Sequence, residues 1–397
     1  MMEDNSRAWL EIDLDAIRHN TQEIRKHTSK QAEIIGVVKA DGYGHGAVEV
    51  SRCILENGVT RLAVSQLDEA IQLRQHGITA PILLLSDLEP ERAEGLLAYD
   101  VAQIVFTREF AEDLSKKAIA LGKIAKIHIK LDTGMGRVGF RAEDSNAIEE
   151  ILAISKLPGL CIEGIFTHFA VSDEGEASAK AYTQKQFALF QEVCRGLQAR
   201  GLDIPLQHVA NSAAILCYPD MHLNAVRAGI ILYGFYPSEE TKAQGVSLKP
   251  AMTFKARLTA VKKVPAGTCL SYGCTYTTKR ESIIATVPVG YADGYFRALS
   301  NKASVLIHGV RVPICGRVCM DQFMVDVTDL VACDQDVLVG DEVVLMGRQG
   351  REEISAEELA DLCDTINYEV ICSPGKRVPK RYISDGKTVS VMNVLIG

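Results

Sequence analysis

The sequence predicts an α/β protein, with an N-terminal (β/α)8 barrel followed by a mostly β C-terminal domain. In the first part, eight short apolar segments alternate with helix-like stretches, the order typical of such a barrel. Past Tyr236-Pro237-Ser238 this alternation stops, and strand-like segments follow one another between Gly, Asp and Pro turns. A length of 397 residues fits two domains, which we place at 1–240 and 241–397.

The N-terminal elements follow from the spacing of apolar residues. Alternation over Trp9–Leu14 predicts a strand, and Asp13 or Asp15 can cap a helix that runs to about Lys26. The eight barrel strands are predicted at Ile34–Val38, Leu62–Val64, Pro81–Leu85, Ala102–Phe106, Ala125–Leu131, Leu160–Phe166, Leu206–Val209 and Leu223–Val226. Helices between them include Asp68–His76, Arg108–Leu121, Asp144–Lys156 and Ser178–Arg200. An open doubly wound sheet has the same alternation, although no G-x-G-x-x-G motif opens the first unit.

The C-terminal part is predicted to contain strands and one helix. The strands are expected at Met252–Val264, Ile283–Val289, Ser304–Ile307, Val310–Ile314, Met324–Val327 and Glu342–Met346. The helix is expected at Ser355–Leu362, where Ser355 and Glu358 have the spacing of a capping box.

Bulk composition limits the class of protein. Hydrophobic residues make up 47% of the chain and charged residues 24%, as in a globular protein with an ample core. The net charge of −8 argues against binding to a nucleic-acid backbone. The N-terminus shows no secretory signal, and no apolar run approaches the ~20 residues of a membrane span. The 11 cysteines form no CxxC pair, so we expect no disulfide framework, no metal site, and reduced thiols in the cytoplasm.

Lys39 ends the first predicted barrel strand and is followed by a glycine-rich loop. Desolvation at such a position favours the neutral amine, which is the form that Schiff-base chemistry requires. A surface lysine that happens to follow a strand is the alternative, because strand ends are where chains turn into solvent.

The decapeptide VVKADGYGHG around Lys39 is similar to the motif by which alanine racemases attach pyridoxal 5'-phosphate (PLP). The resemblance runs from Trp9 to the VPKRY segment near residue 380. It implies that Lys39 binds PLP covalently and that the enzyme interconverts L- and D-alanine, which supplies D-alanine for peptidoglycan. It also implies a homodimer with shared active sites.

Other polar residues stand where predicted barrel strands end, and barrel active sites form at that face. A histidine such as His168 is by itself more often a satisfied core residue, but five coincidences at one rim favour a site. The five are Lys39, the stretch from Lys130 to Arg137, His168, Asn211-Ser212 and Arg227-Ala228-Gly229.

The resemblance assigns several of these residues to the cofactor. Arg227 resembles the arginine that faces the pyridine nitrogen of PLP, and a guanidinium does not protonate that nitrogen. The ring is then a weaker electron sink, which suits clean proton exchange at Cα. The residues that resemble phosphate, cofactor or access-route contacts are Asn211, Ser212, Gly229, Ile230, Tyr43 and Tyr368. For Tyr368, packing between the domains is the alternative.

Lys130 shares a strand face with Asp132, and a buried lysine needs an anionic partner. Asp132 is one candidate. In many relatives the matching lysine is carbamylated and orients the arginine that matches Arg137. The resemblance assigns Arg137 to the substrate carboxylate or the phenolic oxygen of PLP, roles that suit a forked donor.

Racemisation needs a second base on the opposite face of Cα, and the resemblance assigns this role to Tyr272 of the SYG motif, reaching in from the partner subunit. Tyrosine phenols ordinarily titrate near pH 10, so a hydrogen bond from His168, with Arg227 behind it, would have to favour the phenolate. Met320 is expected to enter from the same subunit, and Tyr291 to line the substrate route.

Three alternative functions remain open from the sequence. A racemase of another small amino acid such as serine would use the same scaffold, although Tyr368 and Met320 in family members crowd the substrate and favour a methyl group. A PLP-dependent decarboxylase would need an acidic partner for the pyridine nitrogen, where this chain has Arg227. A non-catalytic PLP-binding barrel would lack a β domain carrying Tyr272.

Overall fold

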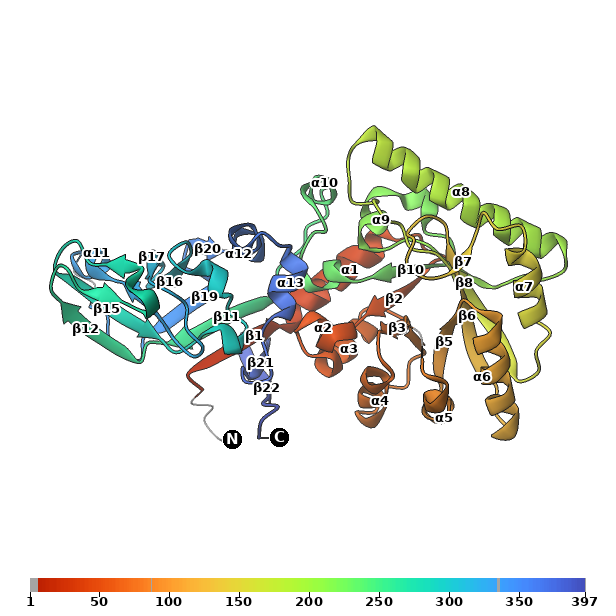
Figure 1. Ribbon diagram of the computed structural model, residues 1–397, viewed down its shortest axis with the longest axis horizontal. Helices are drawn as coiled ribbons and strands as arrows, with labels where there is room; N and C mark the ends of the chain where they lie inside the picture. The colour runs from red at the N-terminus through yellow and green to blue at the C-terminus, as the bar shows by residue number, and fades with distance from the viewer. Residues whose placement is uncertain (1–5, 87, 334–335, 397) are drawn as a thin grey trace. The chain divides into compact units, whose positions relative to one another are not determined.

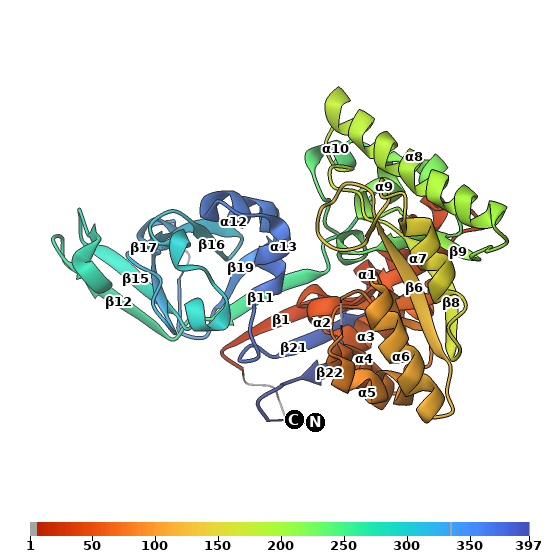
Figure 2. The same cartoon turned by 45° about the vertical axis from the view of Figure 1, so that its right-hand side comes forward.

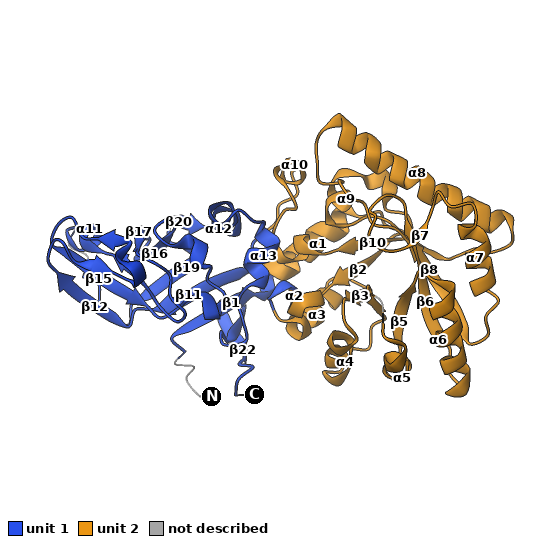
Figure 3. Cartoon of the chain, in the orientation of Figure 1, with its two compact units in different colours: residues 1–15, 43–45, 250–397 blue, residues 16–42, 46–249 orange. Residues whose placement is uncertain are grey.

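The computed structural model describes residues 6–86, 88–333 and 336–396 (Figure 1). The chain forms two compact units (Figure 3). Unit 2 contains Ala16–Gly42 and Gly46–Lys249, and unit 1 contains the described residues up to Asp15, Tyr43–His45, and the chain from Pro250 onward. From residue 6 the described chain therefore runs first through unit 1 and passes into unit 2 along α1 (Leu14–His27).

Unit 2 is a nearly closed barrel of eight parallel strands with helices outside them (Figures 1 and 2). The strand order is β10-β2-β3-β4-β5-β6-β8-β9, so the first and last strands of the barrel, β2 and β10, pair directly. Between β9 and β10 the Arg227 N–H donates to the Ala210 carbonyl at 2.9 Å. This closure confirms the predicted barrel and excludes an open doubly wound sheet.

The eight barrel strands of unit 2 overlap the apolar runs that predict them, and the short β7, which pairs with β6 beside the barrel, was not predicted. The strands of unit 2 are β2 (Glu33–Val37), β3 (Arg61–Val64), β4 (Ile82–Leu84), β5 (Val101–Val105), β6 (Ala125–Asp132), β7 (Phe140–Arg141), β8 (Leu160–Phe166), β9 (Leu206–His208) and β10 (Ala225–Ala228). The main helices are α1 (Leu14–His27), α3 (Ala47–Leu55), α4 (Leu67–Gln75), α5 (Ala93–Ala98), α6 (Arg108–Ala120), α7 (Ala147–Ile154), α8 (Ala177–Ala199), α9 (Ser212–Cys217) and α10 (Glu239–Lys242). Strands such as β5 are buried along their whole length, which is why they are continuous apolar runs.

Unit 1 is built on one mixed sheet in the order β12-β15-β18-β17-β16-β19-β11-β1-β21-β22, so its mostly β character is confirmed. The strands are β1 (Ala8–Asp13), β11 (Met252–Arg257), β12 (Ala260–Val264), β15 (Ser282–Val287), β16 (Ser304–Ile307), β17 (Val310–Cys315), β18 (Phe323–Asp326), β19 (Glu342–Gln349), β20 (Glu352–Ile354), β21 (Lys380–Ser384) and β22 (Lys387–Met392). A separate hairpin pairs β13 (Cys269–Leu270) with β14 (Tyr276–Thr277).

Some elements of unit 1 differ from the predictions. The single strand expected at Met252–Val264 is two, because the N–H of Leu258 donates to Asp341 while that of Thr259 donates to Thr286. The predicted helix is α12 (Ala356–Cys363), and the Ser355 hydroxyl accepts from the Glu358 N–H at 3.1 Å. The sequence did not predict α13 (Asn367–Cys372), β21 or β22.

None of the described helices combines the length and apolar character that crossing a membrane would require.

Candidate active site

Lys39 lies at the carboxyl end of β2, half-buried, at the start of a left-handed turn. The φ angles of Ala40, Asp41 and Gly42 are 52°, 51° and 61°, a conformation unfavourable for the two non-glycine residues. Among the bonds that hold the turn, the Gly42 N–H donates to the Val38 carbonyl at 2.9 Å, and the Asp41 carboxylate accepts from the Ala47 N–H at 2.9 Å. Strain held in this way is typical of functional loops, and it fixes the backbone that presents Lys39.

An anion cradle lies where β9 and β10 end. The Gly229 N–H donates to the Ser212 hydroxyl at 2.9 Å, and Ile230 begins the short 3-10 helix η3 (Ile230–Tyr233). The phenol of Tyr233 donates to the carbonyl of Val37 at 2.9 Å, which holds this segment beside the end of β2. A hydroxyl and backbone N–H groups at a helix start are suitable ligands for a phosphate. Asn211 is the N-cap of α9 and accepts from the Ala214 N–H at 3.0 Å, so its described contacts position Ser212.

Arg227 is 4% exposed, and described carbonyl and imidazole groups surround its guanidinium. Nη1 donates to the Nδ1 atom and the carbonyl of His208, each at 2.9 Å. Nη2 donates to the carbonyls of Thr167 at 2.8 Å and Val209 at 3.0 Å. Burial, followed by the charge of Arg137, lowers the pKa of Arg227 to about 9, so the guanidinium stays charged at neutral pH.

His168 accepts a further hydrogen bond from Arg227, in which its Nδ1 atom lies 3.4 Å from Nη2. Because a guanidinium only donates, Nδ1 is the unprotonated nitrogen and Nε2 bears the hydrogen. Burial lowers the pKa of His168 well below its usual range, and four nearby cations add to the effect; they are Arg227, Arg137, Lys130 and Lys39. His168 is therefore a neutral imidazole with an N–H to donate.

Lys130 is buried, with its Nζ 2.6 Å from the Leu131 carbonyl. Burial and the charge of Arg227 lower the pKa of Lys130 to about 7. Asp132 forms no ion pair with it among the described residues; its carboxylate instead accepts from the N–H groups of Gly134 and Gly136, each at 3.0 Å. These bonds shape the loop that carries the exposed Arg137.

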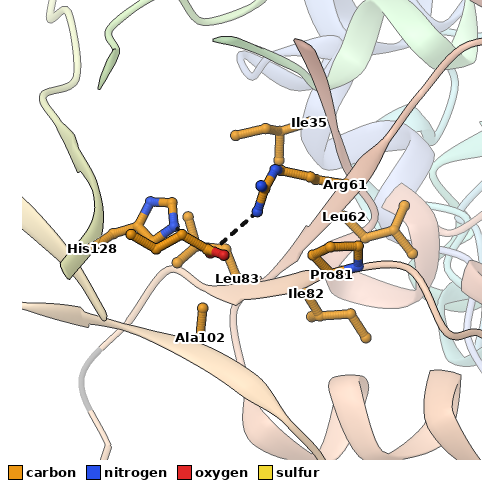
Figure 4. Close-up of a pocket in the computed structure, with 9 residues that line it drawn as sticks. Ile35, Arg61, Leu62, Pro81, Ile82, Leu83, Ala102 and His128 are labelled. Carbon is orange, nitrogen blue, oxygen red and sulfur yellow. Dashed lines mark hydrogen bonds and ion pairs between the residues drawn. The ribbon is translucent and has the colours of Figure 1, made fainter. Parts of the chain in front are cut away.

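Polar residues that the sequence analysis did not single out continue from Arg227 into the barrel: the buried His208 and His128 and the partly buried Glu163 and Arg61. They are described below with Figure 4. The sequence did contain a signal for these residues, because ionisable side chains within predicted barrel strands are rare and call for an explanation.

The other predicted site residues belong to unit 1. Tyr272 lies in the loop of the β13–β14 hairpin and is 73% exposed. Met320 is 53% exposed, and the neighbouring chain is fixed by bonds from the Tyr291 N–H to Cys319 and from the Ala292 N–H to Met320, each at 3.0 Å. Tyr368 lies in the first turn of α13, and its ring lies 6.2 Å from that of the buried Tyr43. Burial raises the pKa of Tyr43, so this phenol is a donor.

In unit 2 the predicted residues lie around the carboxyl ends of the barrel strands; they are Lys39, Arg137, His168, Asn211, Ser212, Arg227, Gly229 and Ile230. In unit 1 the rings of Tyr43 and Tyr368 lie close to each other, while Tyr272 and Met320 are exposed.

Comparison with known proteins gives the family. A family model of the alanine racemase N-terminal domain matches residues 12–237, and a model of the C-terminal domain matches residues 251–382. The chain belongs to the alanine racemase family. The alanine racemase of Clostridium tetani is 48% identical over 386 residues, which are 97% of each chain. That of Methanococcus maripaludis is 48% identical over 375 residues, 94% of this chain and 98% of its own.

Solved structures of the family agree with this assignment. The alanine racemase of Clostridium difficile 630 superposes with a TM-score of 0.94 at 41% identity, covering 99% of this chain and 100% of its own. The Bacillus anthracis alanine racemase with bound L-Ala-P has a TM-score of 0.91 at 43% identity, covering 98% of both. The chain is therefore a PLP-dependent isomerase.

The residues of unit 2 fit PLP. Lys39 offers the amine, and the Ser212 hydroxyl with the N–H group of Ile230 offers donors for a phosphate, while the Gly229 N–H donates to that hydroxyl and orients it. The described bonds of Arg227 use Nη1 and Nη2 and leave the Nε hydrogen for a further acceptor, such as a pyridine nitrogen.

Proposed function

We propose that this enzyme interconverts L-alanine and D-alanine by proton exchange at Cα between two bases. Lys39 acts on the D side, and Tyr272 of the partner subunit acts on the L side. The observation that carries the proposal is the arrangement around Arg227, a charged and buried arginine at the same barrel end as Lys39. Bound PLP supplies electron withdrawal that acidifies the Cα proton.

Arg227 limits how strongly that withdrawal acts. With its pKa at about 9, Arg227 keeps its proton at neutral pH and donates a hydrogen bond without transferring the proton. Its bonds to carbonyls and histidines prevent it from turning away. Electron density therefore remains available at Cα, which favours return of the proton there over transamination.

His168 supports the second base. Its Nε2 hydrogen can be donated to the phenolate oxygen of Tyr272, and the positive charge of Arg227 behind His168 favours that anion. The phenolate then accepts the Cα proton of L-alanine, while the ammonium form of Lys39 returns a proton on the opposite face.

The exposure of Tyr272 and Met320 supports a homodimer. Large side chains that are 73% and 53% exposed on their own subunit are suited to completing a site on another copy. Arg137 supplies a forked donor for the substrate carboxylate. Tyr368 and Met320 restrict the space for the substrate side chain to a methyl group. The enzyme would act in the cytoplasm and supply D-alanine for peptidoglycan.

Lys130 fits the carbamate implied by the family resemblance. It is buried, its pKa is lowered to about 7, and the described part of the chain gives it no carboxylate partner. The neutral amine attacks CO₂; an N–C bond forms and the displaced proton leaves to solvent. The resulting anion would pair with Arg137. A ¹³C carbamate resonance with labelled bicarbonate, absent in Lys130→Met, tests this step.

The test of the two-base assignment is Cα hydrogen exchange in D₂O, followed by proton NMR with holoenzyme and L-alanine. Wild type should lose the Cα proton signal while D-alanine appears, and Tyr272→Phe should nearly abolish racemisation. Tyr276→Phe, in the same hairpin, is the matched control. Full turnover in Tyr272→Phe would refute the role of Tyr272, and no exchange from any small amino acid would refute the racemase.

A further inference from the structure

A continuous chain of hydrogen bonds, buried except at its last member, leads from Arg227 toward the opposite end of the barrel. Nη1 of Arg227 lies 2.9 Å from Nδ1 of His208, and Nε2 of His208 lies 2.9 Å from Nδ1 of His128. Nε2 of His128 lies 3.2 Å from Oε2 of Glu163. Arg61 binds the same oxygen at 3.1 Å. We call Arg227, His208, His128 and Glu163 the polar chain.

The chemistry of the donors fixes the direction of every bond in the polar chain. Arg227 only donates, so Nδ1 of His208 accepts and its hydrogen is on Nε2. That hydrogen is donated to Nδ1 of His128, which therefore has its own hydrogen on Nε2 and donates it to Glu163. Both histidines are fully buried, and burial lowers the pKa of each, so both are neutral. All three N–H groups point from Arg227 toward Glu163.

Two local features place Glu163 at the end of the polar chain. The register between β6 and β8 shifts between Ile127 and His128, which pair with Ile162 and Gly164. Glu163 is thus the extra residue of a β-bulge, a feature that re-aims a side chain. A Cβ on Gly164 would lie 2.5 Å from Nδ1 of His128, so only glycine leaves room for this imidazole.

The partners of Glu163 are the charged Arg61 and the neutral His128. Arg61 and His128 point toward one another beside a small pocket lined by apolar residues such as Leu83 and Ala102 (Figure 4). Hydrogen bonding from His128, with the charge of Arg61, lowers the pKa of Glu163 to about 2, so the carboxylate is ionised. Glu33 also binds Arg61, at 2.9 Å, but it has no described bond to the polar chain.

We propose that Glu163 is a positioning residue for Arg227: through His128 and His208 it fixes the orientation of the guanidinium and stabilises its charge. The inference rests on the proposed function, in which Arg227 is the group that faces PLP. No described carboxylate lies within 4.0 Å of Arg227, so Glu163 is the anion connected to it. Aligned hydrogen bonds polarise one another, which transmits the effect of the carboxylate along two imidazoles.

Glu163→Gln tests the charge while keeping an oxygen that accepts from His128. We expect kcat to fall by about tenfold, as when an outer hydrogen-bond partner of an active group is lost. KM should change little, and the visible absorption of bound PLP should shift. Glu33→Gln is the matched control, because it removes a carboxylate from the same arginine and leaves the polar chain intact. Wild-type kcat and spectrum in Glu163→Gln, or an equal loss in Glu33→Gln, would overturn the proposal.

A second measurement does not depend on activity. ¹⁵N NMR of the histidine side chains in the holoenzyme should show His128 and His208 neutral, each with its hydrogen on Nε2. Glu163→Leu, which removes the acceptor, should change the tautomer or charge of His128. A charged imidazole in wild type, or unchanged histidine signals in Glu163→Leu, would overturn the polar chain. Loss of racemase activity toward alanine in every form would instead refute the proposed function while this NMR result stands.

Discussion

The two ends of the barrel in unit 2 differ in whether their positively charged side chains are paired with carboxylates. At the amino ends of the strands, Arg61 is paired with two carboxylates, those of Glu33 and Glu163. At the carboxyl ends, Arg227 and Lys130 are buried without an ion pair to any described carboxylate. At the amino end two carboxylates of the chain outweigh the one positive charge, whereas the carboxyl end holds positive charge for an anionic ligand. A phosphate-bearing cofactor and a carboxylate substrate complete the second arrangement.

The largest effect should come from Lys39→Ala at the carboxyl end. Because it removes one proton-transferring group and the amine that binds PLP, racemisation should fall by more than about a thousandfold. Chiral chromatography of the product from L-alanine measures this. Lys126→Ala, which removes the partner of Asp100 near the amino end of β6, should retain activity. An active Lys39→Ala enzyme would mean that this end of the barrel is not the reaction site.

Arg227→Gln should have the next largest effect. The shorter, neutral side chain leaves carbonyl oxygens such as that of Thr167 without their donor, and it removes the charge behind His168. We expect racemisation to fall by about a hundredfold, the loss typical of removing one preorganised donor, and pyruvate to appear as a side product. Steady-state kinetics and pyruvate detection measure both, with the exposed pair member Arg108→Gln as control. Unchanged product purity would contradict the role given to Arg227.

Gly164→Ala tests how tightly the imidazole of His128 is packed in the barrel, without changing any charge. The new Cβ collides with the imidazole of His128, and overpacking of this kind should destabilise the fold by about 3 kcal/mol. Urea unfolding of the variant measures the change. Gly95→Ala in α5, where a Cβ meets only a Leu67 methyl at 3.3 Å, should change stability much less. Equal stability of the two variants would show that His128 has room to move.

The barrel and most of its site residues could be predicted because both depend on short-range patterns. Buried parallel strands give apolar runs, and polar residues such as Lys39 and His168 mark the ends of those runs. The polar chain depends instead on the register between β6 and β8. A bulge at Glu163 leaves no trace in hydrophobic periodicity, because it is defined by the partner strand.

Other features also depend on contacts between distant parts of the chain or on elements too short to show a pattern. The strand over Trp9–Leu14 was predicted, but its pairing with β11 and β21 of unit 1 joins residues far apart in sequence. The strands β13 and β14 contain two residues each, too few to show alternation. The capping-box prediction at α12 identified Ser355 as the cap, but the Glu358 carboxylate pairs with Arg311 from β17.

The smallest predicted effect is a dependence of protein stability on pH that comes from Glu163 at the amino end of the barrel. The folded-state pKa of Glu163, about 2, lies below the ~4.3 of an unfolded glutamate. Its carboxylate therefore contributes stability above about pH 4 and loses that contribution as pH falls toward 2. Allowing for partial exposure of the side chain, we expect Glu163→Gln to be about 2 kcal/mol less stable than wild type at pH 7, with the difference shrinking at pH 3.

Denaturant unfolding at both pH values measures this difference. Glu149→Gln, from the exposed pair with Arg200, should differ from wild type by less than about 0.5 kcal/mol at either pH. A Glu163→Gln difference that stays constant between pH 7 and pH 3 would show that its cause is packing rather than charge. The charge of the Glu163 carboxylate would then contribute nothing to the stability of the amino end of the barrel.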